Sequence, residues 1–558
     1  LLWLAARWSH RSGSFSNTKA GTLDLSSSAL LLFAAISGVL LHLNIHAERP
    51  LMSSDLREQW RVNYEQRYAS WADKAQPTLS HIDAAVDIYP QQGIAILTLD
   101  YRLINNTAAA VSELLVGNYS ATAITDISVN VAHSVTADPE LGQFILTLAE
   151  PLAPGDNLRL HSKLTFKQPS FWPAVLPQFV KPSLSYLRAI PLLPTIGLQW
   201  EYLLRDTELR KNYGLAPLAL AKPSVLFASE HGSGQAHPTA IAQYQWVTLH
   251  SVMSTDIGQT PLTQGELLRQ WQEDGRQYAE YQTRTPIRNA LAWFSIGGQT
   301  LRKQQDNIQL TLYSPQLNDA AELNMQAMQD TLSWMQQHVT PYRAKQLSLI
   351  AMPDIGATGY ALPQLMLINY TVGFRAKPAP DAGFDQRYRR AVHETAHQWF
   401  GHDIGNGVTA DSAFLTESLA KYIELVLIEQ RYGAKAMQAL VDYERERFAL
   451  GVRRSTEHTS ALVDASADHD LYSRATLVFA ILRQQLGDAV ISQALRQLWQ
   501  QHAYPKTPAT SMDFVRALQA QLTPPQQQLV ADLLLGTDLS LLLEGDTTGH
   551  GRAGGIQW

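Results

Sequence analysis

One stretch of the sequence, residues 387–433, decides the interpretation of the chain: RYRRAVHETAHQWFGHDIGNGVTADSAFLTESLAKYIELVLIEQRYG. No proline or glycine occurs within residues 384–400, so the first part of this stretch favours a helix. His393, Glu394 and His397 follow one another there in the order His-Glu-x-x-His. Residues four apart lie one turn apart on a helix, so both imidazoles can bind one metal ion. Glu394 then lies beside that ion, where a general base is needed.

A catalytic zinc site takes three protein ligands and leaves the fourth position for water. The helix expected after the connecting loop offers Glu417 and Glu424, which lie seven residues apart and therefore near one face. Either carboxylate can be the third ligand by this geometry. His402, Asp403 and Asp411 in the loop are not excluded by spacing.

The composition limits the chemistry that the chain can offer. Its 558 residues include 44 Lys and Arg against 50 Asp and Glu, a formal net charge of −6. This balance argues against a nucleic-acid partner, because nucleic-acid binders usually carry a basic excess on one face. The absence of cysteine excludes disulfides, thiolate zinc sites, iron–sulfur clusters and a cysteine nucleophile. A bound metal must therefore be held by His, Asp or Glu.

An apolar stretch lies near the start of the sequence. No Asp, Glu, Lys or Arg occurs within residues 25–47, and residues 29–41 (ALLLFAAISGVLL) are almost wholly apolar. A membrane-spanning helix needs about 20 such residues. Basic residues precede the stretch, so the positive-inside rule places everything after about residue 48 outside the cytoplasm. We expect a membrane anchor over residues 1–47; a signal peptide and a buried core helix are the alternatives.

The rest of the chain changes its periodicity along its length. Residues 48–80 are polar and suit a helical connector. Short alternating segments such as ILTLDYRLI then predict a β-rich, sandwich-like domain over residues 81–303. Helical spacing dominates afterwards, which predicts the motif-bearing α/β domain over residues 304–500 and a helical C-terminal part with a flexible tail over residues 501–558. The expected fold class is multidomain α+β.

The motif and its neighbourhood resemble a known family. HETAHQWFG followed by LTESLAKY is similar to the aminopeptidase N family of gluzincin zinc metallopeptidases, whose pattern is His-Glu-x-x-His-Gln-Trp-Phe-Gly and then Leu-Asn-Glu-Gly. Eighteen residues separate the second His from the Glu ligand in that family, whereas nineteen separate His397 from Glu417 here. The longer loop most resembles peptidase-like domains fused to the C-terminal end of bacterial ABC-type transporter permeases. The resemblance covers most of residues 80–500, more weakly in the β-rich domain.

The resemblance implies a thermolysin-like catalytic domain and one zinc ion per chain, held by His393, His397 and Glu417. It implies that Glu394 is the general base. It also implies an oxyanion donor, since the family has a tyrosine about sixty residues past the Glu ligand. Tyr472 lies at the matching place.

One departure from the family concerns the substrate's amino terminus. Aminopeptidases of this family bind the free α-ammonium group with the Glu of a Gly-x-Met-Glu-Asn box. The corresponding loop here is GATGYALPQLMLINY, and no Asp or Glu occurs within residues 355–380. An ammonium group taken out of water needs a partner charge, so the sequence does not predict strict exopeptidase specificity.

These observations predict a membrane-anchored zinc metallopeptidase that acts on peptides outside the cytoplasm. Trp399 and Phe400 are expected in the core rather than in contact with substrate. The alternative is a non-catalytic extracytoplasmic module of an ABC-type transporter, which binds a peptide or a partner subunit. The membrane linkage and the missing ammonium-binding Glu favour that alternative. Glu394 at the general-base position favours the enzyme.

Overall fold

The computed structural model describes ten ranges of the chain: 25–48, 54–118, 123–168, 178–217, 245–353, 357–378, 383–404, 413–455, 459–506 and 508–543. The chain divides into two compact units, and each is described by itself. The first comprises Leu1–Gln59 with Pro169–Pro173, and the second Trp60–Gln168 with Ala174–Trp558.

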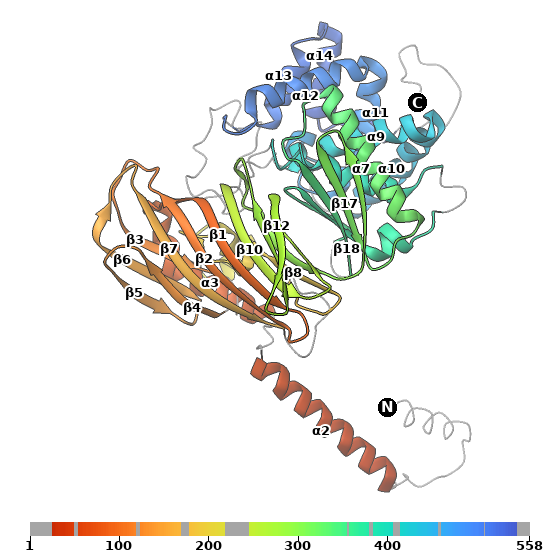
Figure 1. Cartoon of the computed structure of the whole chain (residues 1–558). Coiled ribbons are helices and arrows are strands. Elements are labelled where there is room, and N and C mark those ends of the chain that lie inside the picture. The colour runs from red at the N-terminus through yellow and green to blue at the C-terminus, as the bar shows by residue number, and fades with distance from the viewer. Residues whose placement is uncertain are drawn as a thin grey trace, which may run out of the picture. The chain divides into compact units, whose positions relative to one another are not determined.

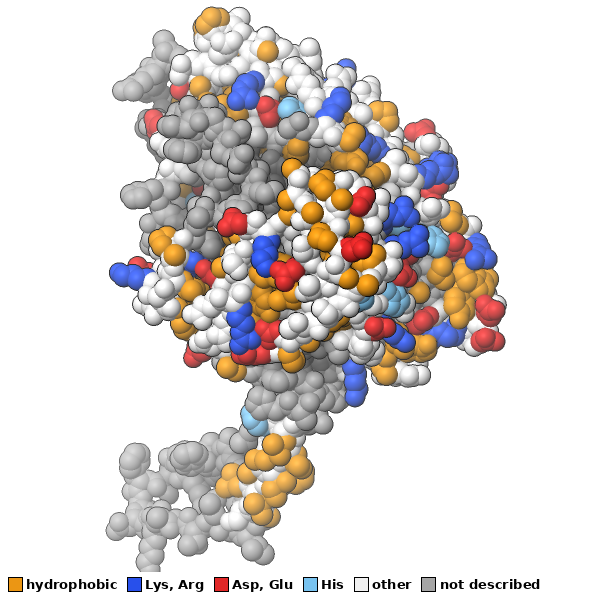
Figure 2. Space-filling model, turned by 90° about the vertical axis from the view of Figure 1, so that its left-hand side faces the viewer, with side chains coloured by type: hydrophobic (Ala, Val, Ile, Leu, Met, Phe, Trp, Pro, Cys, Tyr) orange, Lys and Arg blue, Asp and Glu red, His pale blue; other side chains and the backbone are white. Residues whose placement is uncertain are grey.

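The apolar stretch of the first unit forms one helix, α2 (Leu25–Glu48), as its leucine- and alanine-rich sequence favours. Its large apolar side chains are exposed, among them Leu32 at 63%, Phe33 at 70% and Leu40 at 61% (Figure 2). Among the residues that the structure describes, no helix is long and apolar enough to cross a membrane. The predicted membrane-spanning helix is therefore not found.

The β-rich part begins after a helical connector, and its described residues form three sheets (Figure 1). The connecting helices are α3 (Ser54–Tyr68), η1 (Ala69–Asp73), α4 (Ala189–Leu192), η2 (Trp200–Tyr202) and α5 (Thr207–Asn212). The strands of the largest sheet are β1 (Thr78–Tyr89), β2 (Ile94–Ile104), β4 (Ala123–Val129), β7 (Asn157–Lys167), β10 (Trp246–Asp256), β12 (Glu266–Glu273), β13 (Arg276–Gln282) and β14 (Ile287–Arg288). This eight-stranded sheet has the order β12-β13-β10-β1-β2-β7-β4, and β14 pairs with β10.

Two smaller sheets complete this part. One has the order β5-β6-β3-β9 and the other the order β11-β15-β8. Their strands are β3 (Val111–Gly117), β5 (His133–Asp138), β6 (Gln143–Leu152), β8 (Leu184–Arg188), β9 (Thr195–Ile196), β11 (Thr260–Leu262) and β15 (Ala292–Ile296). Alternate residues of β2 are buried, as the sequence pattern predicts for a strand with one face in the core. The β-rich domain is confirmed, with three sheets where a simple sandwich has two.

A mixed five-stranded sheet with the order β16-β17-β18-β20-β19 follows. Its strands are β16 (Gln299–Gln305), β17 (Ile308–Ser314), β18 (Gln346–Met352), β19 (Gly359–Leu362) and β20 (Leu365–Asn369). β16 begins at residue 299 because it pairs with β17, so the sheet starts ahead of the predicted domain boundary at residue 304. β16 and β19 are the edge strands; β19 pairs with β20, which leaves one row of its backbone groups unused by the sheet.

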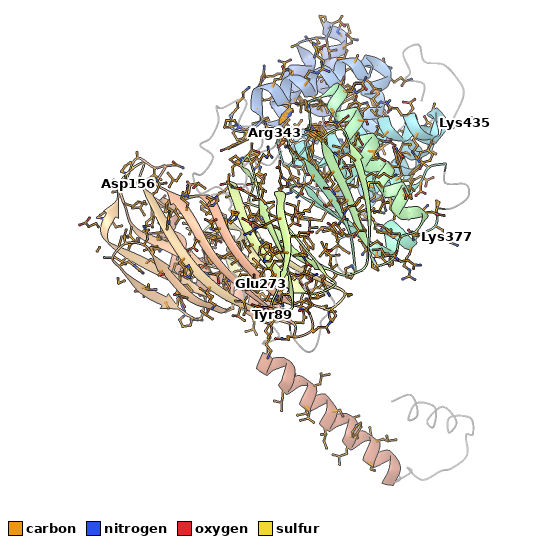
Figure 3. All side chains as sticks on the ribbon, viewed as in Figure 1. Tyr89, Asp156, Glu273, Arg343, Lys377 and Lys435 are labelled. Carbon is orange, nitrogen blue, oxygen red and sulfur yellow. The ribbon has the colours of Figure 1, made fainter. Side chains whose placement is uncertain are left out.

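The other elements described in this part of the chain are helices, and they carry most residues of a large core cluster. They are α7 (Asp319–His338), η4 (Thr371–Arg375), α8 (Gln386–Ala396), η5 (Phe414–Ser418), α9 (Leu419–Tyr432), α10 (Ala434–Arg454), η6 (Leu462–Asp464), η7 (His469–Arg474), α11 (Ala475–Leu486), α12 (Asp488–His502), α13 (Ser511–Gln519), α14 (Pro524–Leu534) and α15 (Ser540–Leu543). Arg343, labelled in Figure 3, links the loop after α7 to these helices, since its guanidinium lies 4.4 Å from the ring centre of Trp499. The predicted flexible tail lies outside the described residues.

Amide groups connect the β-rich part to the edge strand. The backbone N–H of Gly265 donates to Gln364 Oε1 at 2.8 Å. The backbone N–H of Gln364 in turn donates to Gln398 Oε1 at 2.7 Å. Gln398, which directly follows His397, donates from Nε2 to the carbonyl of Leu362 at 3.0 Å. This chain of amides fixes β19 against the helix that carries the histidines.

Candidate active site

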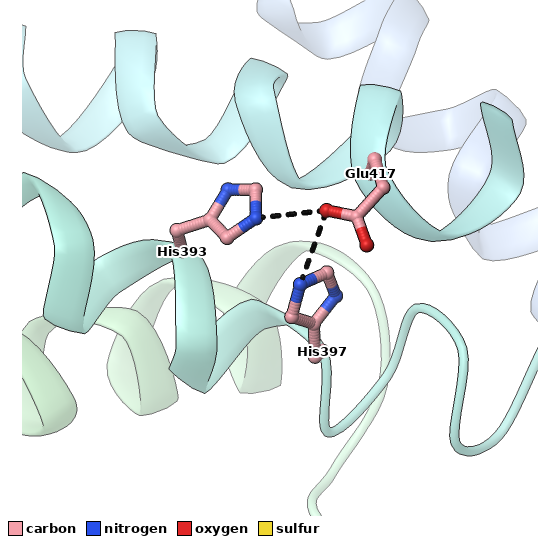
Figure 4. Close-up of side chains that lie close together, drawn as sticks. All are labelled: His393, His397 and Glu417. Atoms are coloured by element: carbon pink, nitrogen blue, oxygen red, sulfur yellow. Dashed lines mark hydrogen bonds and ion pairs between the residues drawn. The ribbon is translucent and has the colours of Figure 1, made fainter. Parts of the chain in front are cut away.

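The structure brings His393, His397 and Glu417 together (Figure 4). Their nitrogen and carboxylate ligand atoms all lie within 4.8 Å of one another. His393 Nε2 is 3.0 Å from Glu417 Oε2, and His397 Nε2 is 3.5 Å from the same oxygen. The histidines come from α8 and its C-cap, while Glu417 comes from the π-helical turn η5. Among the described residues, no other set of three such side chains converges in this way.

The sequence around the motif explains its local structure. Asp385 caps α8 by accepting a hydrogen bond from the backbone N–H of Arg387 at 2.8 Å. The helix ends just before His397, whose backbone is still helical. Trp399 and Phe400 follow and are buried, as predicted, and Trp399 Nε1 donates to the carbonyl of Thr340 at 3.1 Å. The end of the helix is thereby fixed in the core.

The hydrogen bonds of the two histidines orient their rings to bind a zinc ion. His393 Nδ1 lies 2.8 Å from Glu424 Oε1, and His397 Nδ1 lies 3.3 Å from the carbonyl oxygen of Phe400. Both oxygens only accept, so each Nδ1 carries a proton, and the Nε2 atoms, which face Glu417, are the nitrogens that can bind a metal once they lose theirs. Two imidazole nitrogens and one carboxylate oxygen form a common zinc ligand set.

The electrostatics of the site also favour a cation. Burial alone would lower the pKa of His393, but hydrogen bonds to Glu417 and Glu424 raise it to about 10. Burial would raise the pKa of Glu417, yet the charges of His397 and His393 bring it below its ordinary range. Carboxylates on both sides of one imidazole attract positive charge, which a metal at Nε2 would supply.

The contacts of Glu424 distinguish its role from that of Glu417. It lies on the Nδ1 side of His393 and is buried, whereas Glu417 faces both Nε2 atoms. Its other oxygen bonds to Arg389 Nε and to Lys421 Nζ, the latter at 2.6 Å. Burial would raise the pKa of Glu424, but these two cations lower it well below its usual range. Glu424 therefore orients His393 rather than meeting the metal.

Glu394 is buried beside this group, at the edge strand. Burial is the main cause that raises the pKa of its carboxyl group. A Cβ atom on Gly359 would overlap Glu394 Oε1 and Cδ, so glycine at this place in β19 makes room for the carboxylate. A buried carboxylate with a raised pKa beside a metal site suits a proton acceptor at neutral pH.

Tyr472 lies on the π-helical turn η7 and borders the same space. Its ring centre is 5.8 Å from that of His393. Burial, followed by the negative charge of Glu417, raises the pKa of its hydroxyl. The hydroxyl is therefore protonated at neutral pH and can donate a hydrogen bond.

These groups line a cavity of about 840 Å³. Strand β19 borders it, as do α8, α10 and η7, and Arg288 of β14 reaches it from the β-rich part. Arg390 and Asp468 also line it. Sequence analysis did not single out Arg288, Arg390 or Asp468. Asp468 and Arg390 each stand four residues before a predicted catalytic residue, Tyr472 and Glu394, which is the signal that could have found them.

Two of the loop candidates from the sequence, His402 and Asp403, do not join the three ligands. His402 lines the same cavity, where burial lowers its pKa to about 3. Asp403 lines a smaller neighbouring cavity, and burial raises its pKa to about 7. Asp411 lies outside the described residues.

Comparisons with known proteins agree with this geometry. Residues 323–534 match the family model described as "Peptidase family M1 domain". An M1 zinc metallopeptidase from Deinococcus radiodurans is 16% identical with a TM-score of 0.55, over 84% of this chain and 97% of that chain. A variant of it bound to a Tyr-Ser-Ala substrate has the same identity and TM-score, over 84% of this chain and 96% of that one. At this identity, these structures show the fold. No curated protein matches the sequence.

The fold and the site together define a zinc metallopeptidase. More narrowly, the chain carries an M1 family peptidase domain over residues 323–534, with zinc as its metal. The predicted resemblance to the aminopeptidase N family, which is the M1 family, is thereby confirmed. The likeness to permease-fused domains receives no support from these comparisons and stays a prediction.

Proposed function

We propose that the chain cleaves peptide bonds at this site with Glu394 as the general base, and that it does not require a free amino terminus. The observation that supports the proposal is the position of the buried Glu394 carboxylate, between the three metal-binding side chains and edge strand β19. The strand's free edge offers backbone groups to an extended peptide. The cavity of about 840 Å³ has room for several residues of a peptide.

Each side chain has one role in the mechanism. His393, His397 and Glu417 would hold the zinc ion, which supplies Lewis acidity and a water of near-neutral pKa when bound. Glu394 takes a proton from the attacking water and delivers it to the leaving amine. Tyr472 donates a hydrogen bond to the carbonyl oxygen of the scissile bond as negative charge develops on it.

The specificity follows from the charges that border the cavity. Among the described residues, five acidic ones line it, and four of them already have a partner or a catalytic role, namely Glu394, Glu417, Glu424 and Glu444. The fifth, Asp468, is exposed to solvent. Strand β19, where the family places its ammonium-binding Glu, carries no acidic residue. A buried anchor for an α-ammonium group is therefore absent from the described lining.

The test compares one peptide series, with and without N-acetylation, on zinc-loaded wild type and Glu394→Gln. Wild type should cleave both forms at rates within about tenfold, a barrier difference of about 1.4 kcal/mol or less. Glu394→Gln should retain zinc and lose hydrolysis. A strong preference for the free amine would show that another acid binds it. If wild type cleaves neither form in a broad peptide library, the binding-module alternative replaces the enzyme.

We further infer that α2 attaches the chain to a membrane and that the peptidase domain acts outside the cytoplasm. The exposed apolar side chains of α2 and the uncharged run over residues 25–47 support this proposal. An ABC-type transporter subunit is the membrane partner that the sequence resemblance suggests. Protease added to intact cells should digest the β-rich domain, and protection until lysis would contradict the orientation. Co-purification with a permease would test the partner.

A further inference from the structure

Three arginines lie in the first half of α8, and two of them have a carboxylate partner. Arg387 pairs with Asp385 at 2.7 Å. Arg389 pairs with Glu424 and Glu444. Arg390 has no ion pair with any residue that the structure describes. Its one hydrogen bond, from Nη1 to the carbonyl of Val372, is 3.5 Å long and therefore weak.

Arg390 faces the cavity. It stands four residues before Glu394, so the two side chains share a face of α8, one turn apart, and both line the cavity. Partial burial and the neighbouring charge of Arg389 lower the pKa of its guanidinium, which nevertheless stays protonated in proteins. A charge removed from water is unfavourable without a partner, so this position favours an anionic ligand.

The described carboxylates near Arg390 already have other partners or another role. Glu424 already bonds to Arg389, Lys421 and His393. Glu394 must remain free to exchange a proton with water. The charges of Glu394 and Glu424 partly compensate that of Arg390, but no described carboxylate forms an ion pair with it, so a ligand that enters the cavity can supply this partner.

We propose that Arg390 binds a carboxylate group of the peptide substrate, either an Asp or Glu side chain or the C-terminal carboxylate. The inference rests on the proposed peptidase function and adds its substrate class. A guanidinium presents two parallel N–H donors that match a carboxylate. One helical turn rises about 5.4 Å and an extended peptide about 3.3 Å per residue. The carboxylate therefore belongs to a residue within about two positions of the scissile bond.

The experiment measures binding in the zinc-loaded Glu394→Gln protein, which leaves peptides uncut. Calorimetry compares peptides that carry one Glu, or a matched Gln, at each of two positions on either side of the expected scissile bond. Each peptide is made with a free and with an amidated C-terminus. One acidic form should bind at least about tenfold more tightly than its neutral match, because a charge-assisted hydrogen bond contributes at least this much. The Glu/Gln and acid/amide comparisons identify which carboxylate is bound.

Arg390→Gln, in the same background, should bring that ratio close to one. Two matched controls should retain it: Arg387→Gln on the same helix, and Arg447→Gln, whose side chain lines the same cavity but is 55% exposed. Zinc content is measured for every variant. Equal loss of the ratio in Arg447→Gln would show a general field of positive charge and overturn the assignment to Arg390.

Two further results would overturn the inference. One is a ratio near one in the parent protein, which needs no Arg390 variant and therefore no assumption about its folding. The other is a ratio that survives Arg390→Gln. Failure of wild type to hydrolyse any peptide would refute the proposed function alone, because the binding preference is measured in a protein that does not hydrolyse.

Discussion

Replacing Glu424 with glutamine removes one negative charge from a buried group of four ionic side chains. Arg389 and Lys421 provide two positive charges, and Glu424 and Glu444 provide two negative charges; the exposed fractions are 10%, 1%, 3% and 1%. The glutamine keeps an oxygen that can accept the Nδ1–H of His393. The substitution therefore leaves the hydrogen bond possible while it unbalances the charges.

The size of the effect follows from burial. One uncompensated charge in such a group lowers the free energy of unfolding by about 3–5 kcal/mol. Zinc affinity should fall about 10–100-fold, as expected for a group that orients a ligand from outside the coordination sphere. Glu417→Gln should have the opposite pattern, with a small loss of unfolding free energy and a large loss of zinc affinity. Its side chain is 23% exposed, so its loss costs less stability in the metal-free protein but more zinc affinity, because a direct ligand is removed.

The assay combines urea unfolding of the metal-free proteins with zinc titration against a chromophoric chelator. A double variant, Lys421→Met with Glu424→Gln, removes one charge of each sign and should recover most of the lost stability. The reasoning is refuted if Glu424→Gln is as stable as wild type, or if it loses more zinc affinity than Glu417→Gln. The second result would mean that Glu424 is the metal ligand.

Three other substitutions test the remaining assignments. Tyr472→Phe should lower kcat about 10²–10³-fold with unchanged zinc content, because one oxyanion donor is removed; normal turnover would contradict its role. Gly359→Ala should lower kcat/KM by about 10²-fold or more, since the new Cβ displaces the Glu394 carboxylate, and wild-type activity would show that this contact is unimportant. Burial would raise the pKa of Glu444, but Lys421 and Arg389 lower it from 4.5 to about 2. A carboxyl group whose pKa is lower in the folded than in the unfolded protein stabilises the folded state at pH values above the unfolded-state pKa. The difference in unfolding free energy between wild type and Glu444→Gln, measured by urea unfolding, should therefore hold down to about pH 4.5 and narrow toward pH 2. A constant difference would exclude this linkage.

The sequence predicted the convergence of the metal-binding residues because helix periodicity is local. The spacing of His393 and His397 needs one turn of α8, and the resemblance to a family supplied Glu417. Periodicity could not separate Glu417 from Glu424, since seven residues place both near one face of a regular helix. In the structure, Glu417 lies in the π-helical turn η5, which precedes the regular helix and changes the register between the two.

Other features depend on packing between distant segments. Glu444 lies 55 residues after Arg389 and pairs with it across two helices, which no local pattern records. The predicted domain boundary at residue 304 falls within β16 for a similar reason: β16 resembles the strands before it, and only its pairing with β17 assigns it to the later sheet. Arg387 and Arg389 have carboxylate partners among the described residues and Arg390 has none, a difference that the sequence does not show.

The amide chain that runs from Gly265 through Gln364 to Gln398 affects how peptide binding and cleavage depend on pH. Amides neither gain nor lose protons in the range where carboxylates and imidazoles titrate. The connection that fixes edge strand β19 against α8 therefore stays the same when Glu394 or the zinc-binding histidines change their protonation state. Acid can stop the proton transfer and release the metal while β19 keeps its position beside the cavity that receives the peptide. Peptide binding and peptide cleavage are then separable functions of pH within one site.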